Sequence, residues 1–323
     1  MANKPSRTVD EQIELLERRG MKIRNRRKVA NWLRRVSYYR LKGYWWDMQD
    51  DTTNHHFAEG WSFEDIIERY QFDKELRITL FHAIETLEIA LRTKLIYHMS
   101  QAHGGLWYLD SSLTVDSALH NKHLFQLKDE FAKSKEVFVK EYLTKHPNLL
   151  VSPQRGYQSD EDPDAWIILE VATFGELSKI YKNLNHQLPA KSAIANDFGL
   201  DKHSDLSSWL ETMAYLRNMV AHHSRLWSRN MVKKPATVAK TRNTWLEFPL
   251  YPAMEKRPFY LISVLLYLCD AVGEGEHLRN DIHRLVYRYR HLPLHRMGFF
   301  PEWKNQPLWQ LSLLRRICLY LKK

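Results

Sequence analysis

Three polar residues near the middle of the chain, Arg217, Asn218 and His222, are of the types that can break a phosphodiester bond. They lie in residues 206–227, which read LSSWLETMAYLRNMVAHHSRLW. An imidazole can take a proton from a ribose 2′-hydroxyl or return one to a leaving 5′-oxygen. A guanidinium can stabilise the negative charge that develops on the phosphate oxygens. Arg217 and His222 therefore suffice in outline for transesterification of RNA without a metal ion.

Residues 206–227 have the periodicity of one amphipathic helix. At about 100° per residue, one stripe is apolar and is expected to face the core. The stripe comprises Trp209, Met213, Leu216, Val220 and Trp227. His223 joins it and is interpreted as a core histidine, whereas Asn218, His222 and Arg225 lie on the other face. Because Asn218 and His222 are at i and i+4, the amide is expected to hold the imidazole in one tautomer.

Arg217 and His222 lie about 140° apart on a regular helix, so one helix is not expected to close both around a single phosphate. The small Ala221 between them would let a second helix approach. We therefore expect a facing copy to complete the site in a homodimer. The spacing alone is a weak signal, because Arg92 with His98 and Arg290 with His295 also fit it. A hydrogen-bonded surface pair is the alternative.

A second long helix is predicted from the N-cap Ser62 to about Met99. Its core stripe comprises Leu80, Ile84, Leu87, Leu91, Leu95 and His98. Arg77, Glu88 and Arg92 fall along the edge of this stripe, with Glu85 one position further round. They form either an ion-pair network that orients the helix or a supporting, substrate-side group beside Arg217 and His222.

The chain as a whole is predicted to be all-α. Glycine is scarce, with 11 residues, and no sustained alternation of apolar and polar residues is present. We expect a small basic and aromatic helical subdomain over residues 1–60 and a helical core over residues 61–230. A basic loop and C-terminal helices over residues 231–323 are expected to pack on that core.

Composition narrows the class of partner. The net charge is +10, and we interpret the excess as spread along the chain, which favours a polyanion such as RNA over a membrane. Cys269 and Cys318 both lie in apolar runs, so neither a disulfide framework, a metal site nor a cofactor is expected. No signal region or membrane span is evident, and we expect a soluble cytoplasmic protein.

Two basic regions are candidate RNA contacts. Arg40 and Lys42 interleave with aromatic residues in YYRLKGYWW, which could stack on unpaired bases or pack a small subdomain onto the core. Residues 276–291 form a predicted helix with Arg279, Arg284 and Arg288, which could contact an RNA backbone or form a solvated face. Arg225, on the same predicted face as His222, completes this set.

Six stretches occur in the order YYRLKGYW, RYQFDKELR, AIETLEIALRTKL, TFGELSKIY, LRNMVAHHSRLW and MGFFPEWKNQPLW. In this order they resemble the Abi-like family of bacterial abortive-infection proteins, the AbiD and AbiF group. That family is placed in the HEPN superfamily of α-helical ribonucleases and RNA binders. The resemblance implies a HEPN-type helical bundle and a composite, metal-independent Arg-Asn-x-x-x-His site across a dimer.

Carried over by residue, this motif falls on Arg217, Asn218 and His222, and the helix with Glu85, Glu88 and Arg92 matches the family's preceding polar helix. Ser228 departs from the family, which usually has Asn after Leu-Trp, and is expected to alter a helix end rather than catalysis. The resemblance also implies toxin-like growth arrest in anti-phage defence and, for some members, a partner non-coding RNA.

The first hypothesis is therefore a metal-independent endoribonuclease, with His222 as acid or base, Arg217 as phosphate stabiliser and Asn218 as orienter. The second is a non-catalytic protein that holds a structured RNA on its basic surface, which needs no reactive His222. A third is a regulator that binds duplex DNA through the N-terminal helices. The RNA target and the activating trigger do not follow from the sequence.

Overall fold

The fold is all-α, as the sequence predicts. The computed structural model describes residues 5–147, 149, 161–238, 240–247 and 254–311. Within these residues the only sheet is one antiparallel pair of short strands, β1 and β2, which the sequence did not reveal. The elements in order are α1 Val9–Arg18, α2 Arg26–Val36, α3 Tyr38–Lys42, β1 Gln49–Asp51, β2 His56–Phe57, α4 Phe63–His103, α5 Ser117–Lys133, α6 Val137–Lys145, α7 Ala165–Ile168, α8 Phe174–Asn183, α9 Pro189–Asp197, α10 His203–Ala221, α11 Pro258–Ala271 and α12 Gly275–Arg288.

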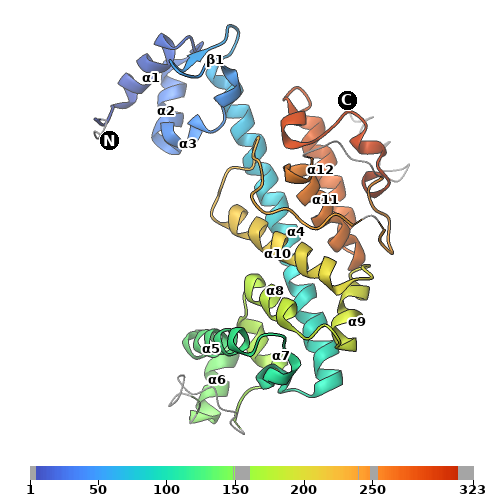
Figure 1. The fold of residues 1–323 in the computed structure, drawn as a ribbon. Helices are drawn as coiled ribbons and strands as arrows, with labels where there is room; N and C mark the ends of the chain where they lie inside the picture. Colours follow the sequence, from blue (N-terminus) through green and yellow to red (C-terminus); the bar gives the residue numbers. More distant parts are fainter. Residues whose placement is uncertain (1–4, 148, 150–160, 239, 248–253, 312–323) are drawn as a thin grey trace.

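Helix α4 runs through most of the length of the molecule (Figure 1). Its start is the predicted one, because the Ser62 N–H donates to the Asp65 carboxylate at 2.8 Å in a capping box. Its 41 residues correspond to about 60 Å. The predicted leucine and isoleucine stripe is buried, and helices α8, α9, α10, α11 and α12 pack against α4. This helix is therefore the axis on which the other elements are placed.

The N-terminal subdomain, α1 to β2, lies at one end of α4 (Figure 1). Helix α1 begins at a capping box, whose Thr8-x-x-Glu11 pattern is visible in the sequence and in which Glu11 accepts from the Thr8 N–H at 2.6 Å. The aromatic run after α2 divides by burial: Tyr44 and Trp45 are buried, whereas Tyr39 and Trp46 are exposed. The boundary predicted near residue 60 falls between β2 and α4, and the division into domains stays a prediction.

The opposite end of α4 carries α5, α6 and α7 (Figure 1). Helix α8 begins at another capping box, Thr173-x-x-Glu176, in which the Thr173 N–H donates to Glu176 at 2.8 Å. Most of residues 148–164, whose prolines and acidic SDEDPD stretch predict a surface loop, lies outside the described residues. So does most of LSLLRRICLYL near the end of the chain, which contains Cys318 and whose apolar pattern predicts a closing helix.

Helices α11 and α12 form the remaining side of the core. Pro258 opens α11, and twelve of the fourteen residues of this helix are buried. The aromatic residues after α12 pack on the start of α11, where the centroids of the stacked Phe259 and Trp309 rings are 5.7 Å apart. No helix in the described part of the chain is both long and apolar enough to cross a membrane.

Candidate functional site

Helix α10 carries the Arg-Asn-x-x-x-His residues, but it is shorter than predicted. It ends at Ala221 rather than at Trp227, so the helical phase assigned to His223, Arg225 and Trp227 was wrong. The predicted stripe does hold inside the helix, where Trp209, Met213, Leu216 and Val220 are buried. Trp227 is also buried, on the segment after the helix, with its ring against Phe72 at 5.7 Å.

The two neighbouring histidines lie at the turn that ends α10. His223 has a positive φ of 55° and is exposed, so its predicted place in the core was wrong. Its N–H donates to the Val220 carbonyl at 3.1 Å, and the Ser224 N–H donates to the Met219 carbonyl at 2.8 Å. This is the Schellman pattern, in which glycine is the usual left-handed residue. His223 therefore helps to terminate the helix at a backbone cost of about 1 kcal/mol.

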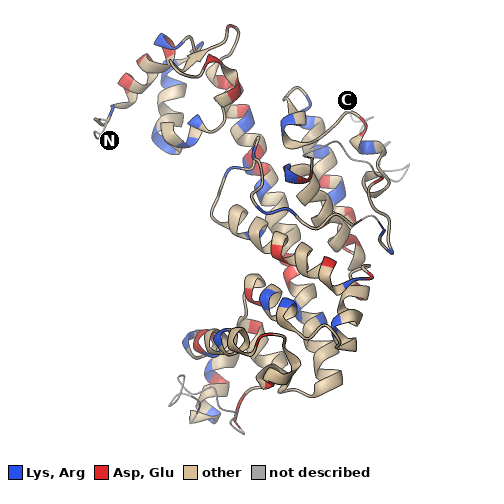
Figure 2. Cartoon of the chain, in the orientation of Figure 1, with Lys and Arg blue, Asp and Glu red and all other residues tan. Residues whose placement is uncertain are grey.

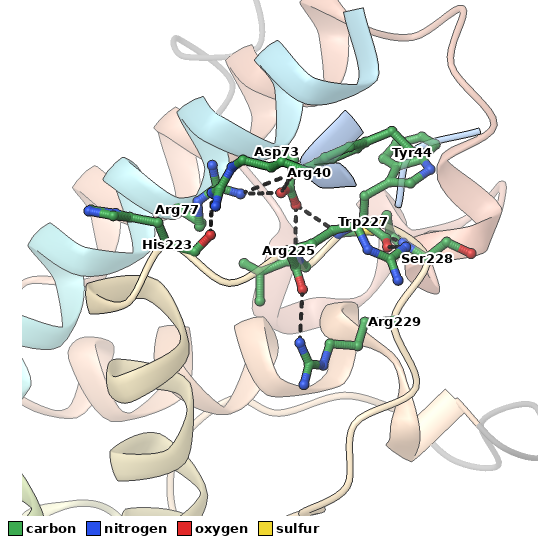
Figure 3. A network of polar contacts seen from close by, with 11 residues as sticks. Arg40, Tyr44, Asp73, Arg77, His223, Arg225, Trp227, Ser228 and Arg229 are labelled. Carbon is green, nitrogen blue, oxygen red and sulfur yellow. Dashed lines mark hydrogen bonds and ion pairs between the residues drawn. The ribbon is translucent and has the colours of Figure 1, made fainter. Parts of the chain in front are cut away.

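The segment that leaves this turn is held by a buried carboxylate on α4 (Figure 3). Asp73 is fully buried and accepts hydrogen bonds from the N–H groups of Leu226 and Trp227, at 3.0 and 2.7 Å. It also accepts from the Tyr44 hydroxyl at 2.6 Å and pairs with Arg77. Because these donors come from three parts of the chain, Asp73 fixes the path of the segment after His222.

The N-terminal subdomain also contacts this turn and the segment that follows it. The Arg40 guanidinium donates to the His223 carbonyl (Figure 3). Gly43 lies so close to Arg225 that a Cβ there would be 2.9 Å from the Arg225 Nε. The turn beside His222 is therefore packed between α4 and α3, and its position depends on both.

Arg217 lies on the side of α10 that meets α4. It is half-buried and lines a groove of about 360 Å³ together with Phe81, Ile84, Glu85, Glu88, Ile89 and Arg92. The structure thus brings together Arg217 and the predicted supporting residues Glu85, Glu88 and Arg92. Two carboxylates and two guanidinium groups in one groove form a polar site that can hold a charged group.

Arg92 forms hydrogen bonds that fit one of its two predicted roles, that of orienting α4. Its guanidinium donates to the carbonyls of Leu169 and Ala172, both at 2.9 Å, and to the Glu88 carboxylate at 3.3 Å. These bonds fasten the chain before α8 to α4. Arg92 is therefore part of an orienting network, and its contact with substrate stays a prediction.

Asn218 and His222 are exposed on α10 and at its end. No hydrogen bond joins the two side chains among the described residues, so the orienting role of Asn218 stays a prediction. His222 keeps near-helical backbone angles, φ −86° and ψ 14°. Its side chain is thus directed roughly as on a regular helix, well away from Arg217. The geometry leaves the imidazole accessible to a substrate or to another chain.

A sequence model of the Abi-like protein family matches residues 31–228, which include α4, the polar groove and the motif. The chain belongs to the Abi-like protein family. Membership of this family suggests a part in abortive-infection defence. No curated protein and no solved structure matches the chain.

Four other predicted RNA contacts of this Abi-like chain, all arginines, form hydrogen bonds or ion pairs within the chain. Arg225 donates to the Trp227 carbonyl at 2.7 Å, and its partial burial lowers its pKa. Arg279 pairs with Asp270 and donates to the Leu308 carbonyl at 2.8 Å. Arg288 pairs with Glu75 at 2.6 Å, and Arg284 with Asp281 at 3.2 Å. All four have structural partners, and their RNA contacts stay predictions.

Asp73 was not singled out from the sequence of the Abi-like chain, whereas Arg77 was placed at the edge of the long helix's stripe and Tyr44 in the aromatic run. A signal for a buried pair exists, because Asp73 and Arg77 fall on the buried stripe of α4, two turns and one turn before Leu80 respectively. A charged residue on a core stripe requires a buried partner. What the sequence did not show is that this partner is the segment following His222.

Proposed function

We propose that this protein is a metal-independent endoribonuclease of HEPN type that acts in anti-phage defence. The observation that carries the proposal is the position of the Arg-Asn-x-x-x-His motif at the exposed end of α10, beside the groove that Arg217 shares with Glu85 and Glu88. Membership of the Abi-like family supports the defence role. The alternative is an RNA-binding protein without catalysis.

The reaction proposed is attack of a ribose 2′-hydroxyl on the adjacent phosphate. His222 takes the proton of the 2′-hydroxyl or gives one to the 5′-oxygen as the bond between phosphorus and that oxygen breaks. Arg217 stabilises the charge on the phosphate oxygens in the transition state. The products are a 2′,3′-cyclic phosphate, or the 3′-phosphate formed by its hydrolysis, and a 5′-hydroxyl.

We propose further that a second copy of the chain completes the site. Arg217 and His222 leave α10 in different directions, and the groove beside Arg217 is bordered by the exposed apolar side chains of Phe81 and Ile89. Exposed apolar residues around a polar groove suit a contact between two proteins. In a symmetric dimer, His222 of one copy would approach Arg217 of the other.

The experiment is cleavage of total RNA and of phage-induced RNA by the purified chain in the presence of EDTA. We expect 5′-hydroxyl ends from the wild type and a loss of rate of at least about 100-fold for His222→Ala, because proton transfer typically contributes this much. His277→Ala, which replaces an exposed histidine on α12, is the matched control and should cleave like the wild type.

If His222→Ala and the wild type cleave RNA at equal rates, His222 is not the acid or base of the reaction. If the wild type binds RNA but cuts none of the RNAs tested, the binding protein without catalysis replaces the enzyme. A preference for duplex DNA over RNA would instead favour a DNA-binding regulator.

A further inference from the structure

One segment accounts for the net positive charge of the chain. Residues 18–42 contain eleven Lys and Arg and no Asp or Glu. This segment alone carries +11, against +10 for the whole chain, so the remaining residues together carry −1. The expectation that the excess is spread along the chain was therefore wrong. The source of the basic character is the region from the end of α1 through α3 (Figure 2).

Helix α2 presents four of these eleven basic residues on a single face. Its apolar residues Val29, Ala30, Leu33 and Val36 are buried on one side. At about 100° per residue, the opposite side comprises Arg27, Lys28, Asn31, Arg34 and Arg35, and all five are exposed. We name these five residues the basic face. It contains no apolar residue that could enter a lipid bilayer, so a membrane surface is a poor match.

Few carboxylates neutralise this segment. Among the described residues, Arg26 forms the one ion pair of residues 18–42 with a carboxylate, to Glu17 at 2.9 Å. Arg35 instead lies over the Trp32 ring at 4.1 Å. Like charges so close together repel each other and lower the stability of the subdomain. A bound polyanion would relieve this repulsion.

Shortly after α2, the chain presents an exposed aromatic residue and a contact with the motif turn. Tyr39, at the start of α3, has an exposed fraction of 86%. The next residue, Arg40, reaches the His223 carbonyl. A chain of phosphates lying on α2 would therefore pass α3 before it reached the turn that holds His222. An exposed aromatic ring on this path suits stacking of an unpaired base.

We propose that the basic face binds the phosphate backbone of RNA, with an unpaired base stacked on Tyr39, and leads the strand to the turn at His222. The choice of RNA and the direction of the strand rest on the proposed function. The phosphate-binding role of α2 does not.

The test measures binding to the full chain carrying His222→Ala, so that the RNA stays intact. The probe is a fluorescent single-stranded RNA of about 20 nucleotides, titrated at several salt concentrations. The triple variant Arg27→Gln, Lys28→Gln, Arg34→Gln removes three phosphate contacts. We expect the slope of log K against log salt to shrink by about 2 and the affinity at 0.1 M salt to fall about 100-fold.

The matched control removes the same charge elsewhere. Lys135, Lys140 and Lys145 are exposed on and next to α6, at the other end of the molecule. Their replacement by Gln should leave the slope unchanged if α2 is the site. The melting temperature of the α2 variant should equal or exceed that of the parent, because the mutations remove repulsion. This readout separates lost binding from lost folding.

Tyr39→Ala tests the stacking step. It should lower the affinity for single-stranded RNA about tenfold and leave the salt slope unchanged. An unchanged affinity would overturn the stacking at Tyr39.

The outcomes separate the two proposals. RNA binding that depends on α2, without cleavage by the wild type, upholds the basic face and removes the nuclease. If the wild type cleaves RNA and the salt slopes of the α2 and α6 triple variants are equal, the nuclease is upheld and the basic face is removed. Equal loss of binding in the α2 and α6 variants would show a diffuse effect of charge and overturn the inference. Binding of vesicles with anionic lipid, but not of RNA, would also overturn it.

Discussion

At the scale of single residues, Asp73 is a charged side chain on a stripe of α4 that is otherwise mainly apolar. Burial raises the pKa of its carboxyl group, while Arg77, the Tyr44 hydroxyl and the N–H groups of Trp227 and Leu226 oppose this rise. Hydrogen bonds from the segment after the motif are thus part of what allows the charge to be buried. The carboxylate in turn fixes this segment.

We predict that Asp73→Ala lowers the free energy of unfolding by about 3–5 kcal/mol, because Arg77 would be left as an unpaired buried charge. Urea unfolding followed by far-UV circular dichroism measures the change. Asp50→Ala is the control, since Asp50 forms an exposed pair with His56 at 2.9 Å, and its unfolding midpoint should match the wild type. Equal midpoints for both variants would contradict the role given to Asp73.

At the scale of elements, α10 is fastened on both sides by one carboxylate. Glu211 accepts from Lys182 of α8 at 2.8 Å and from Lys233, after the motif, at 2.6 Å. These two bonds lower the pKa of Glu211 to about 2. The helix that carries the motif is therefore linked to its neighbours through a group that stays ionised in mild acid.

We predict that this link stabilises the fold above the ordinary glutamate pKa of 4.5 and that the stabilisation is lost as pH falls through about 2. The sign follows from the lowered pKa, because the unfolded chain binds the proton more readily. Glu211→Gln should be less stable than the wild type at pH 6 by no more than about 1 kcal/mol, since the pair is largely exposed.

The measurement is the difference in free energy of unfolding between the two proteins at pH 6, 4 and 2. The difference should vanish at the lowest pH. Glu14→Gln, which replaces an exposed glutamate on α1, should show no such trend. A difference that stays constant from pH 6 to pH 2 would contradict the prediction.

At the scale of the whole molecule, one face of α4 is left uncovered by the other helices in the part of the chain that the structure describes. Ile78, Phe81 and Ile89 have exposed fractions of 61, 46 and 53%. Two of these three border the groove of Arg217. Apolar residues so close to the candidate site are the surface on which a second copy is expected to pack.

We predict that the double variant Phe81→Glu, Ile89→Glu is a monomer at concentrations at which the wild type is a dimer, because it places charge in an apolar contact. Light scattering after size exclusion measures the mass, and RNA cleavage should fall with dimer formation. Val137→Glu replaces a more exposed apolar residue on α6 and should remain dimeric. A monomeric wild type that cleaves RNA would exclude the composite site.

The sequence by itself determined what depends on near neighbours in the chain. The capping boxes at Thr8, Ser62 and Thr173 and the apolar stripes of α4 and α10 are local patterns, so the helices and most of their buried faces could be predicted. The same holds for the motif residues Arg217, Asn218 and His222, whose identity and spacing need no fold.

Only the tertiary structure decided what depends on contacts between distant segments. The end of α10 at Ala221 requires His223 in a left-handed conformation, which helical periodicity does not anticipate. The segment beyond it is set by Asp73 and Arg40, which lie about 150 residues or more away in the chain. Its path depends on hydrogen bonds and ion pairs between chain segments that meet only after folding, and these leave no period in the sequence.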